Sequence, residues 1–214
     1  FFLLVLLAAL AAQATTSITV GSNAGITYHV GSVVGVASVP TLGVSSYILL
    51  LAAYNFFMWL FKPRNAVTWK KSWAQLGFNV GMHAIAAALS GWSFLATRAL
   101  LGDSSWAGMI LPWPVAAIVL EELNLWMLIG ILRLQNGVQF GAFAMWREEI
   151  WASQIGTAVM MIGGAMLSVA IDRYDWVGIV IFYLPTALSA YAFRLYVTQM
   201  QMQMDNLEKI VQER

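Results

Sequence analysis

Two adjacent glutamates, Glu121 and Glu122, are the residues whose type and position point most directly to chemistry. They lie inside an apolar stretch at about 107–132, and Asn124 follows them. Glu121 and Asn124 are three residues apart and therefore share a helix face, whereas Glu122 points about 100° away. A carboxyl group inside a membrane span is costly unless it is paired or hydrated, so it often marks a path for protons or cations. The alternative interpretation is a structural hydrogen-bonded site, or a pair that faces another subunit.

The preceding apolar stretch, at about 74–98, carries a stripe of polar side chains. On a helix of 3.6 residues per turn they fall within about 40° of a common direction. With Asn79 and with His83, whose imidazole exchanges protons near neutral pH, the stripe suggests a water-lined path. We favour the other interpretation, in which small and polar residues pack one helix against another. The stripe consists of Gln75, Asn79, His83, Ser90, Ser93 and Thr97.

The stretch at about 151–171 repeats this pattern. Small and polar residues again share one face, and the pair Gly163-Gly164 beside it allows the backbone of another helix to approach closely. We therefore expect this face to pack against a neighbouring helix, in the same chain or in another one. Its polar members are Gln154, Thr157 and Ser168.

The sequence lacks the residue patterns of the common enzyme and cofactor sites. It has no cysteine and only 2 histidines, so neither a zinc site nor a haem held by two histidines within a span is indicated. No phosphate-binding loop, dinucleotide fingerprint or nucleophile elbow is present. We therefore predict no catalytic site, no metal and no cofactor, and a protein that is not an enzyme.

The composition assigns the chain to a membrane. Of its 214 residues, 60% are hydrophobic and 10% are charged, against about 25% charged in a typical soluble domain. A chain of this length cannot bury so much apolar side chain in its own core, whereas lipid can cover it. The formal net charge of +1 gives no field that would attract nucleic acid. The partners we expect are the lipid bilayer and other membrane subunits, in a homo- or hetero-oligomer.

Five apolar stretches have roughly the 20 residues with which a helix crosses a bilayer. We therefore predict an all-α fold, a polytopic transmembrane helical bundle of five spans within residues 42–197. The predicted spans are about 42–61, 74–98, 107–132, 151–171 and 176–197.

The segments on either side of this bundle have a different composition. Residues 1–14 resemble a signal peptide or begin a sixth span. In the Gly/Ser/Val-rich segment 15–41, Pro40 and the glycines weaken a helix, so we favour a mainly non-helical segment outside the membrane, with strand character near Ile18. The alternative is a helical segment, because the pairs Gly21/Gly25 and Gly31/Gly35 fit the small-xxx-small spacing that lets helix backbones approach closely. Residues 198–214 are polar with a recurring apolar face, which predicts an amphipathic helix.

The distribution of basic residues predicts the orientation of the spans. If all five stretches cross the membrane, nine of the 11 lysines and arginines fall on one side, and Arg98 and Arg173 fall on the other. Because basic loops remain in the cytoplasm, the C-terminus is expected to be cytoplasmic and residues 15–41 non-cytoplasmic. The nine are Lys62, Arg64, Lys70, Lys71, Arg133, Arg147, Arg194, Lys209 and Arg214.

These observations leave two functional hypotheses. The first, which we favour, is a non-enzymatic integral membrane subunit of a larger assembly of the secretion, conjugation or energy-coupling type. It would pack through its small and polar helix faces, and it accounts for the scarcity of catalytic groups. The second is a small transporter or proton/cation channel that uses Glu121, Glu122 and His83.

Overall fold

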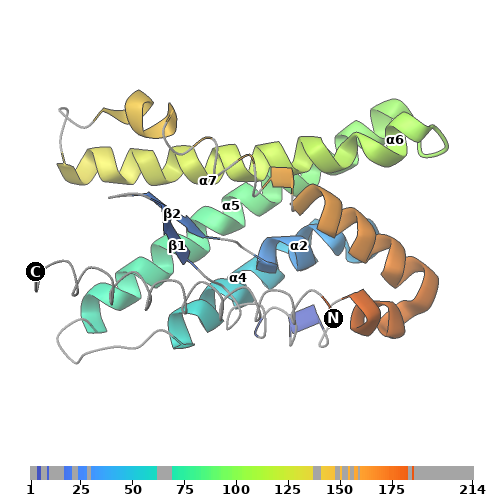
Figure 1. The fold of residues 1–214 in the computed structure, drawn as a ribbon, viewed down its shortest axis with the longest axis horizontal. Helices are drawn as coiled ribbons and strands as arrows, with labels where there is room; N and C mark the ends of the chain where they lie inside the picture. The colour runs from blue at the N-terminus through green and yellow to red at the C-terminus, as the bar shows by residue number, and fades with distance from the viewer. Residues whose placement is uncertain are drawn as a thin grey trace, which may run out of the picture.

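The structure, a computed structural model, is a bundle of α-helices with one small β-hairpin (Figure 1). The hairpin pairs β1 (Ser17–Val20) with β2 (Ala24–Thr27) in antiparallel register. Strand β1 covers the residues in which the sequence analysis expected strand character. The structure describes residues 4–5, 9, 17–20, 24–27, 30–61, 69–136, 141–147, 150, 154, 157–158, 160–182 and 185.

Two long helices, α5 (Trp69–Leu101) and α7 (Pro112–Asn136), form the frame of the bundle. Because the chain reverses in the short segment between them, they run antiparallel (Figure 1). Near this turn the ring centroids of Phe94 and Trp113 are 4.8 Å apart, which sets the register of one helix against the other. Helix α5 has 33 residues, which corresponds to about 50 Å.

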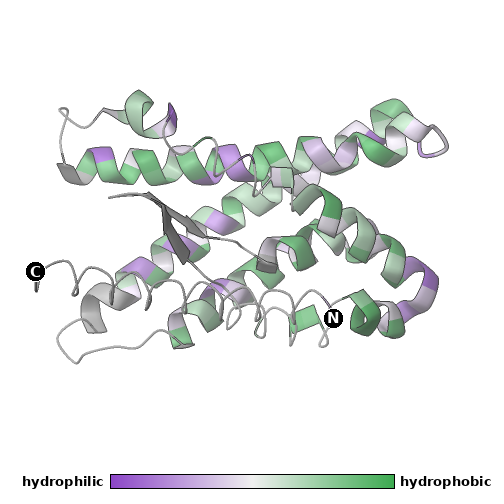
Figure 2. Cartoon of the chain, in the orientation of Figure 1, coloured by the Kyte–Doolittle hydropathy of each residue, from purple (hydrophilic) through white to green (hydrophobic). Residues whose placement is uncertain are grey.

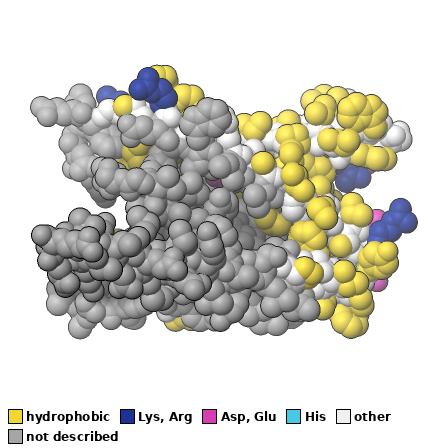
Figure 3. All heavy atoms as spheres, in the orientation of Figure 1, with side chains coloured by type: hydrophobic (Ala, Val, Ile, Leu, Met, Phe, Trp, Pro, Cys, Tyr) yellow, Lys and Arg dark blue, Asp and Glu magenta, His cyan; other side chains and the backbone are white. Residues whose placement is uncertain are grey.

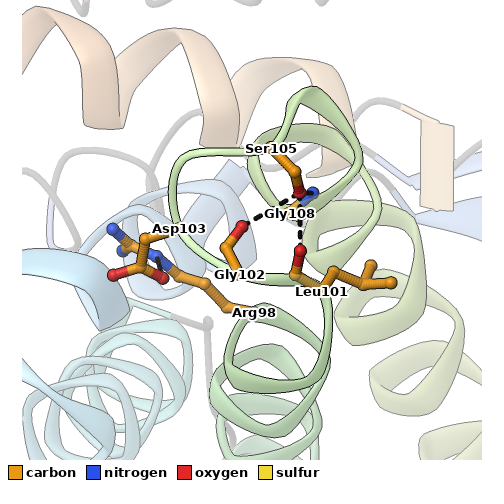
Figure 4. A network of polar contacts seen from close by, with 6 residues as sticks. All are labelled: Arg98, Leu101, Gly102, Asp103, Ser105 and Gly108. Carbon is orange, nitrogen blue, oxygen red and sulfur yellow. Dashed lines mark hydrogen bonds and ion pairs between the residues drawn. The ribbon is translucent and has the colours of Figure 1, made fainter.

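A serine holds the turn between these helices (Figure 4). Ser105 precedes α6 (Trp106–Ile110), and its Oγ accepts a hydrogen bond from the backbone N–H of Gly108 at 2.9 Å. The same hydroxyl lies 2.7 Å from the carbonyl oxygen of Leu101 and donates there. Gly102 has a φ of +79°, a left-handed conformation that glycine adopts without strain. Ser105 therefore ties the end of α5 to the start of α6.

An exposed ion pair lies at the same turn, where Arg98 Nε donates to Asp103 Oδ1 at 2.8 Å (Figure 4). Helix α6 then continues almost directly into α7, with only Leu111 between them. Pro112 occupies the first position of α7, where its missing N–H and fixed φ are tolerated. The proline therefore starts a helix here, and α6 and α7 together form one long apolar segment.

Helix α4 (Val44–Phe61) lies along α5 in the opposite direction. Near its start, a Cβ added to Gly91 would be 3.1 Å from both methyl carbons of Val44, so the two backbones pack closely. Near its end, the ring centroids of Trp59 and Trp73 are 4.4 Å apart. Contacts at both ends therefore hold α4 against α5 along most of its length.

The helices α2 (Val30–Ala37) and α3 (Val39–Leu42) differ from the sequence-based expectation. We predicted a mainly non-helical segment outside the membrane, yet this part of it is helical and packs inside the bundle, with Ser38 and its neighbours buried. The glycines explain the difference: a Cβ on Gly35 would be 2.6 Å from the ring of Tyr47. Close packing on α4 therefore outweighs the low intrinsic helix propensity of these residues.

Residues 160–182 are helical and reverse direction near Asp175, which has a φ of +49° (Figure 1). Their first half packs on α2 through two glycines. A Cβ on Gly163 would be 3.0 Å from Val33, and one on Gly164 would be 2.5 Å from Val36. The small residues therefore let this segment approach the buried helix closely.

The main core cluster lies where α4, α5 and α7 meet α2 and residues 160–182. Most of its members are small or aliphatic, which allows the helix axes to come close. The buried members are Val36, Val39, Tyr47, Leu51, Ala86, Ala87, Phe94, Ala116, Ala117, Leu120 and Met160.

Two helices are long and apolar enough to cross a membrane, Trp73–Leu101 and Trp106–Leu134. They coincide with the predicted stretches at about 74–98 and 107–132, so helices in those positions are confirmed. The first predicted stretch is a shorter apolar helix, Val44–Leu60. Figure 2 shows that hydrophobic residues dominate these helices and that hydrophilic ones interrupt α7 near its middle.

The remaining predicted segments are described only in part. Of the stretch at about 176–197, the structure describes residues 176–182 and 185. The predicted helix at 198–214 lies outside the described residues, as does most of the signal-like segment 1–14. Within that segment Leu4 is buried, in a second cluster with Val34, Leu50 and Leu167.

Candidate functional site

The hydroxyl group of Tyr47 is the most unusual polar group in the core. Tyr47 lies on α4, its exposed fraction is 0%, and its hydroxyl forms no hydrogen bond. Ser90 is the polar side chain beside it, and the carboxyl group of Glu121 lies within electrostatic range. A buried hydroxyl without a partner costs about 1–3 kcal/mol. Helices α4 and α5 therefore bring Tyr47 and Ser90 together, and Glu121 on α7 acts on Tyr47 only electrostatically.

Glu121 enters this group because of its place on α7. The preceding residue, Leu120, is fully buried, as are Ala116 and Ala117 one turn earlier. Glu121 is half-buried at the border of this apolar face. The local sequence therefore places one carboxyl group against the core in the middle of an apolar helix.

Ser90 links two of the helices directly. Its Oγ donates to the carbonyl oxygen of Ala116 at 2.7 Å, and Ser90 itself is fully buried. The other hydroxyls of the stripe bond locally: Ser93 donates to Ser90 O, and Thr97 donates to Ser93 O, both at 2.7 Å. Of these three packing candidates, Ser90 is therefore the one whose hydroxyl group donates to another helix.

Glu122 lies in a different environment from its neighbour. Its Oε2 accepts a hydrogen bond from Trp146 Nε1 at 3.1 Å. The ring of Trp146 also stacks near Trp126 and Phe143, with centroids 6.2 Å and 5.4 Å away. The helical residues 142–147 thus fold back onto α7 and hold Glu122, while Glu121 faces the core.

Asn124 and His83 lie further along the same two helices. Asn124 is half-buried, and its Oδ1 is buried without a hydrogen-bond partner. His83 is buried, and its Nδ1 lies 2.8 Å from the carbonyl oxygen of Asn79. Because a carbonyl oxygen can only accept, Nδ1 carries the hydrogen. Helices α5 and α7 are antiparallel, so positions at equal distances from the contact between Ser90 and Ala116 lie side by side. His83 is two turns before Ser90, and Leu123 is two turns after Ala116, so His83 lies level with Leu123, the neighbour of Asn124.

The polar stripe at 74–98 and that at 151–171 differ in burial along their length. Gln75 is exposed, whereas Asn79 and then His83 are increasingly covered. In the second stripe Gln154 is exposed, Thr157 is half-buried and Ser168 is buried. Each stripe therefore runs from a polar end into the interior of the bundle.

The sequence analysis missed Tyr47 and Trp146. Tyr47 begins a set with Leu50, Leu51 and Tyr54, all fully or almost fully buried. Their spacing of three, four and seven residues defines one helix face and was available as a signal. The hydrogen bond between Trp146 and Glu122 left no such signal in the sequence, because it joins residues 24 positions apart. No spacing rule predicts such a tertiary contact.

Among the described residues, no group of three or more His, Asp or Glu side chains is placed to hold a metal ion. In comparisons with family models, curated proteins and solved structures, nothing matches the chain. What it does must therefore be argued from its own residues.

Proposed function

We propose that the chain is a multi-pass integral membrane protein and a non-enzymatic subunit of a larger membrane assembly. The exposure of its apolar helices carries this proposal. Only 28% of the most apolar stretch of Trp73–Leu101 is buried inside the protein, and 22% of that of Trp106–Leu134. The core helix of a soluble protein would be mostly buried. Lipid or other subunits must therefore cover these faces.

The outward face of α5 illustrates the need for such a cover. Ile85, Leu89 and Trp92 follow one another at helical spacing and are all exposed, Trp92 to 66%. Figure 3 shows hydrophobic side chains over much of the described surface. Water would make this surface aggregate, whereas a bilayer tolerates it.

The distribution of charge supports a bundle that crosses the membrane along its long axis. The ion pair between Arg98 and Asp103 lies at the turn before α6, at the same end as the turn near Asp175 (Figure 1). Arg133 lies at the opposite end of α7. Figure 3 shows basic side chains at both ends and a hydrophobic region between them. With basic loops inside, the end near Arg133 is cytoplasmic in this proposal, and so is the C-terminus.

The way the helices pack supports a role in assembly. Glycine and serine contacts, at Gly163, Gly164 and Ser90, hold the helices together within the chain. The same kind of surface joins helices of different chains in membranes. We place the subunit in an apparatus of the secretion, conjugation or energy-coupling type, because such assemblies contain membrane subunits that perform no catalysis themselves.

The native mass tests this proposal. Extraction from the host membrane in a mild detergent, followed by native mass spectrometry, should give a particle much heavier than the 23.5 kDa chain, with defined partner chains. A monodisperse monomer from that membrane would contradict the proposal. The protein should also resist extraction from the membrane by alkaline carbonate, because spanning helices stay in the bilayer.

The orientation has its own test, because the chain contains no cysteine. In intact cells, a membrane-impermeant thiol reagent should label the variants Asp103→Cys and Asp175→Cys from outside. It should label Arg133→Cys and Arg147→Cys only after the cells are opened. The reverse pattern would show that the assigned direction is wrong.

A second candidate function is a small transporter or proton/cation channel using Glu121, Glu122 and His83. The half-buried carboxyl group of Glu121, in the middle of an apolar helix, favours it. In liposomes, the purified chain should then carry a proton or cation flux that Glu121→Gln abolishes. Equal flux in the wild-type and Glu121→Gln chains would exclude a role for this carboxyl group.

A further inference from the structure

Glu122 lies in the middle of an outward, apolar face of α7. Ile118 is one turn before it and Trp126 is one turn after it, and both of these side chains are exposed. Glu122 itself is half-buried. Its carboxyl group therefore belongs to the surface that lipid or another subunit must cover. In a membrane, a carboxyl group on such a surface is costly unless it is paired.

Aromatic rings surround this carboxyl group on one side. Trp146 Nε1 donates to Glu122 Oε2 at 3.1 Å, which fixes the orientation of the carboxyl group. The ring centroid of Trp146 is 6.2 Å from that of Trp126 and 5.4 Å from that of Phe143. Phe143 is 66% exposed, and Trp126 is exposed as well, so both offer ring surface beside Glu122. A carboxylate and an aromatic ring attract the same kind of group, a cation.

The described part of the chain supplies no positive charge to Glu122. Trp146 provides a neutral N–H group only. Among the described residues, neither Arg133 on the same helix nor Arg147 next to Trp146 forms an ion pair with Glu122. The cation that completes this site must therefore come from elsewhere.

The depth of Glu122 indicates the source of this cation. Along α7, Glu122 lies 11 residues before Arg133, which corresponds to about 16 Å. In the proposed membrane placement Arg133 lies at the cytoplasmic surface, and the hydrocarbon core is about 30 Å thick. The amines of lipid headgroups stay at that surface, whereas a transmembrane helix can carry a lysine or arginine to this depth. The position of Glu122 therefore favours a helix of another subunit over a lipid headgroup.

A second copy of this chain does not offer such a residue on its described helices. No lysine or arginine occurs at 30–61, 72–97, 112–132 or 160–172. The basic residues that flank these ranges lie at the ends of the bundle. The complementary charge therefore points to a chain of different sequence.

We propose that Glu122, Trp126 and Phe143 form a docking site for a transmembrane helix of a different subunit, which carries a lysine or arginine at the depth of Glu122. The cation pairs with the carboxylate and lies against the ring of Trp126. Trp146 is a positioning residue, because its N–H orients the carboxyl group. This inference rests on the proposed membrane assembly and names the chemistry of one partner in it.

Glu122→Gln in the full chain tests the pairing. The side-chain carbonyl oxygen of glutamine can still accept from Trp146 Nε1, so helical content and thermal unfolding should stay as in the wild type. After extraction from the host membrane in a mild detergent, the variant should retain the basic partner at least about tenfold less, because the partner's cation is left buried and unpaired.

Asp172→Asn is the matched control for this loss of charge. It removes one acidic group from an exposed position near the turn at Asp175, far along the bundle from Arg133. This variant should retain the partner as the wild type does.

Photocrosslinking from the exposed position 143 maps the partner directly. Phe143→p-benzoylphenylalanine in the native complex should form a cross-link with another chain, within about two helical turns of a lysine or arginine in an apolar segment. Replacing that basic residue by glutamate should release the partner from the wild-type chain. Glu122→Lys should then restore the binding, because the two charges are exchanged.

Different outcomes separate this site from the assembly itself. Full retention of every partner chain by Glu122→Gln would refute the site and leave the assembly proposal standing. Cross-links from position 143 that reach only lipid, or only a second copy of the chain, would refute it in the same way. A monomeric wild-type particle would refute both proposals, because the chain would then have no partner.

Discussion

Ser90 in α5 donates its hydroxyl hydrogen to the carbonyl oxygen of Ala116 in α7, at a distance of 2.7 Å. Both residues are fully buried. The contact joins the two longest apolar helices at the point where Phe94 and Trp113 also meet, one turn away. These contacts fix the position of α7 along α5, and they therefore determine which α7 residues lie level with Tyr47.

Replacing Ser90 should weaken the pairing of α5 with α7. Ser90→Ala removes a hydrogen bond between helices but leaves Ala116 O bonded within its own helix, so we expect a loss of about 0.5–1 kcal/mol. Ser93→Ala is the matched control, because Ser93 bonds only within α5, to Ser90 O. The free energy of unfolding in bicelles, measured by steric trapping, compares the two. An equal effect of both variants would show that the contact between the helices contributes nothing.

The glycines against α2 should not tolerate a methyl group. In Gly164→Ala the new Cβ would be 2.5 Å from Val36 Cγ1, so the helices must separate, and we expect a loss of about 1–3 kcal/mol. Gly77 in α5 is the matched control, because a Cβ there meets nothing within 4 Å. Gly77→Ala should be neutral or stabilise the helix by up to about 1 kcal/mol. Thermal unfolding in detergent would show the contrast, and opposite signs are the expected result.

Trp146 should hold the helical residues 142–147 against α7. Trp146→Phe keeps the ring contacts with Trp126 and Phe143 but removes the N–H that Glu122 accepts. We expect Glu122 to become more reactive to a water-soluble carbodiimide and the segment to be cleaved faster by protease. Phe143→Leu removes a ring contact but keeps the hydrogen bond, and it should leave the reactivity of Glu122 close to wild type. Unchanged reactivity in Trp146→Phe would show that the hydrogen bond does not shield the carboxylate.

Ser105 should stabilise the turn between α5 and α6 as a helix cap. Ser105→Ala removes the acceptor for Gly108 N and should destabilise the protein by about 1 kcal/mol. Ser104→Ala, at the neighbouring exposed position, is the control and should have little effect. Asp103→Asn breaks only an exposed ion pair and should lower the unfolding free energy by less than about 1 kcal/mol. Hydrogen exchange at Gly108 N reports directly on the cap.

The outcome for α2 and α3 explains why local rules failed where they did. Intrinsic propensity argued against a helix near Gly35 and Pro40. The structure places Pro40 in the first turn of α3, where a missing N–H is harmless, and places Gly35 against the ring of Tyr47. The same residues that disfavour an isolated helix are those that fit one into a crowded interior.

The sequence by itself determined the helical, lipid-compatible character of the chain, the two long apolar helices and the presence of carboxyl groups within one of them. These properties follow from composition and from the 3.6-residue period, which act locally. Only the tertiary structure decided that Ser90 donates to Ala116 O, that Glu122 accepts from Trp146, and that α2 lies inside the bundle. Such pairings join residues far apart in the chain, and they are selected by which side chains can pack and hydrogen-bond together, a property that no local pattern records.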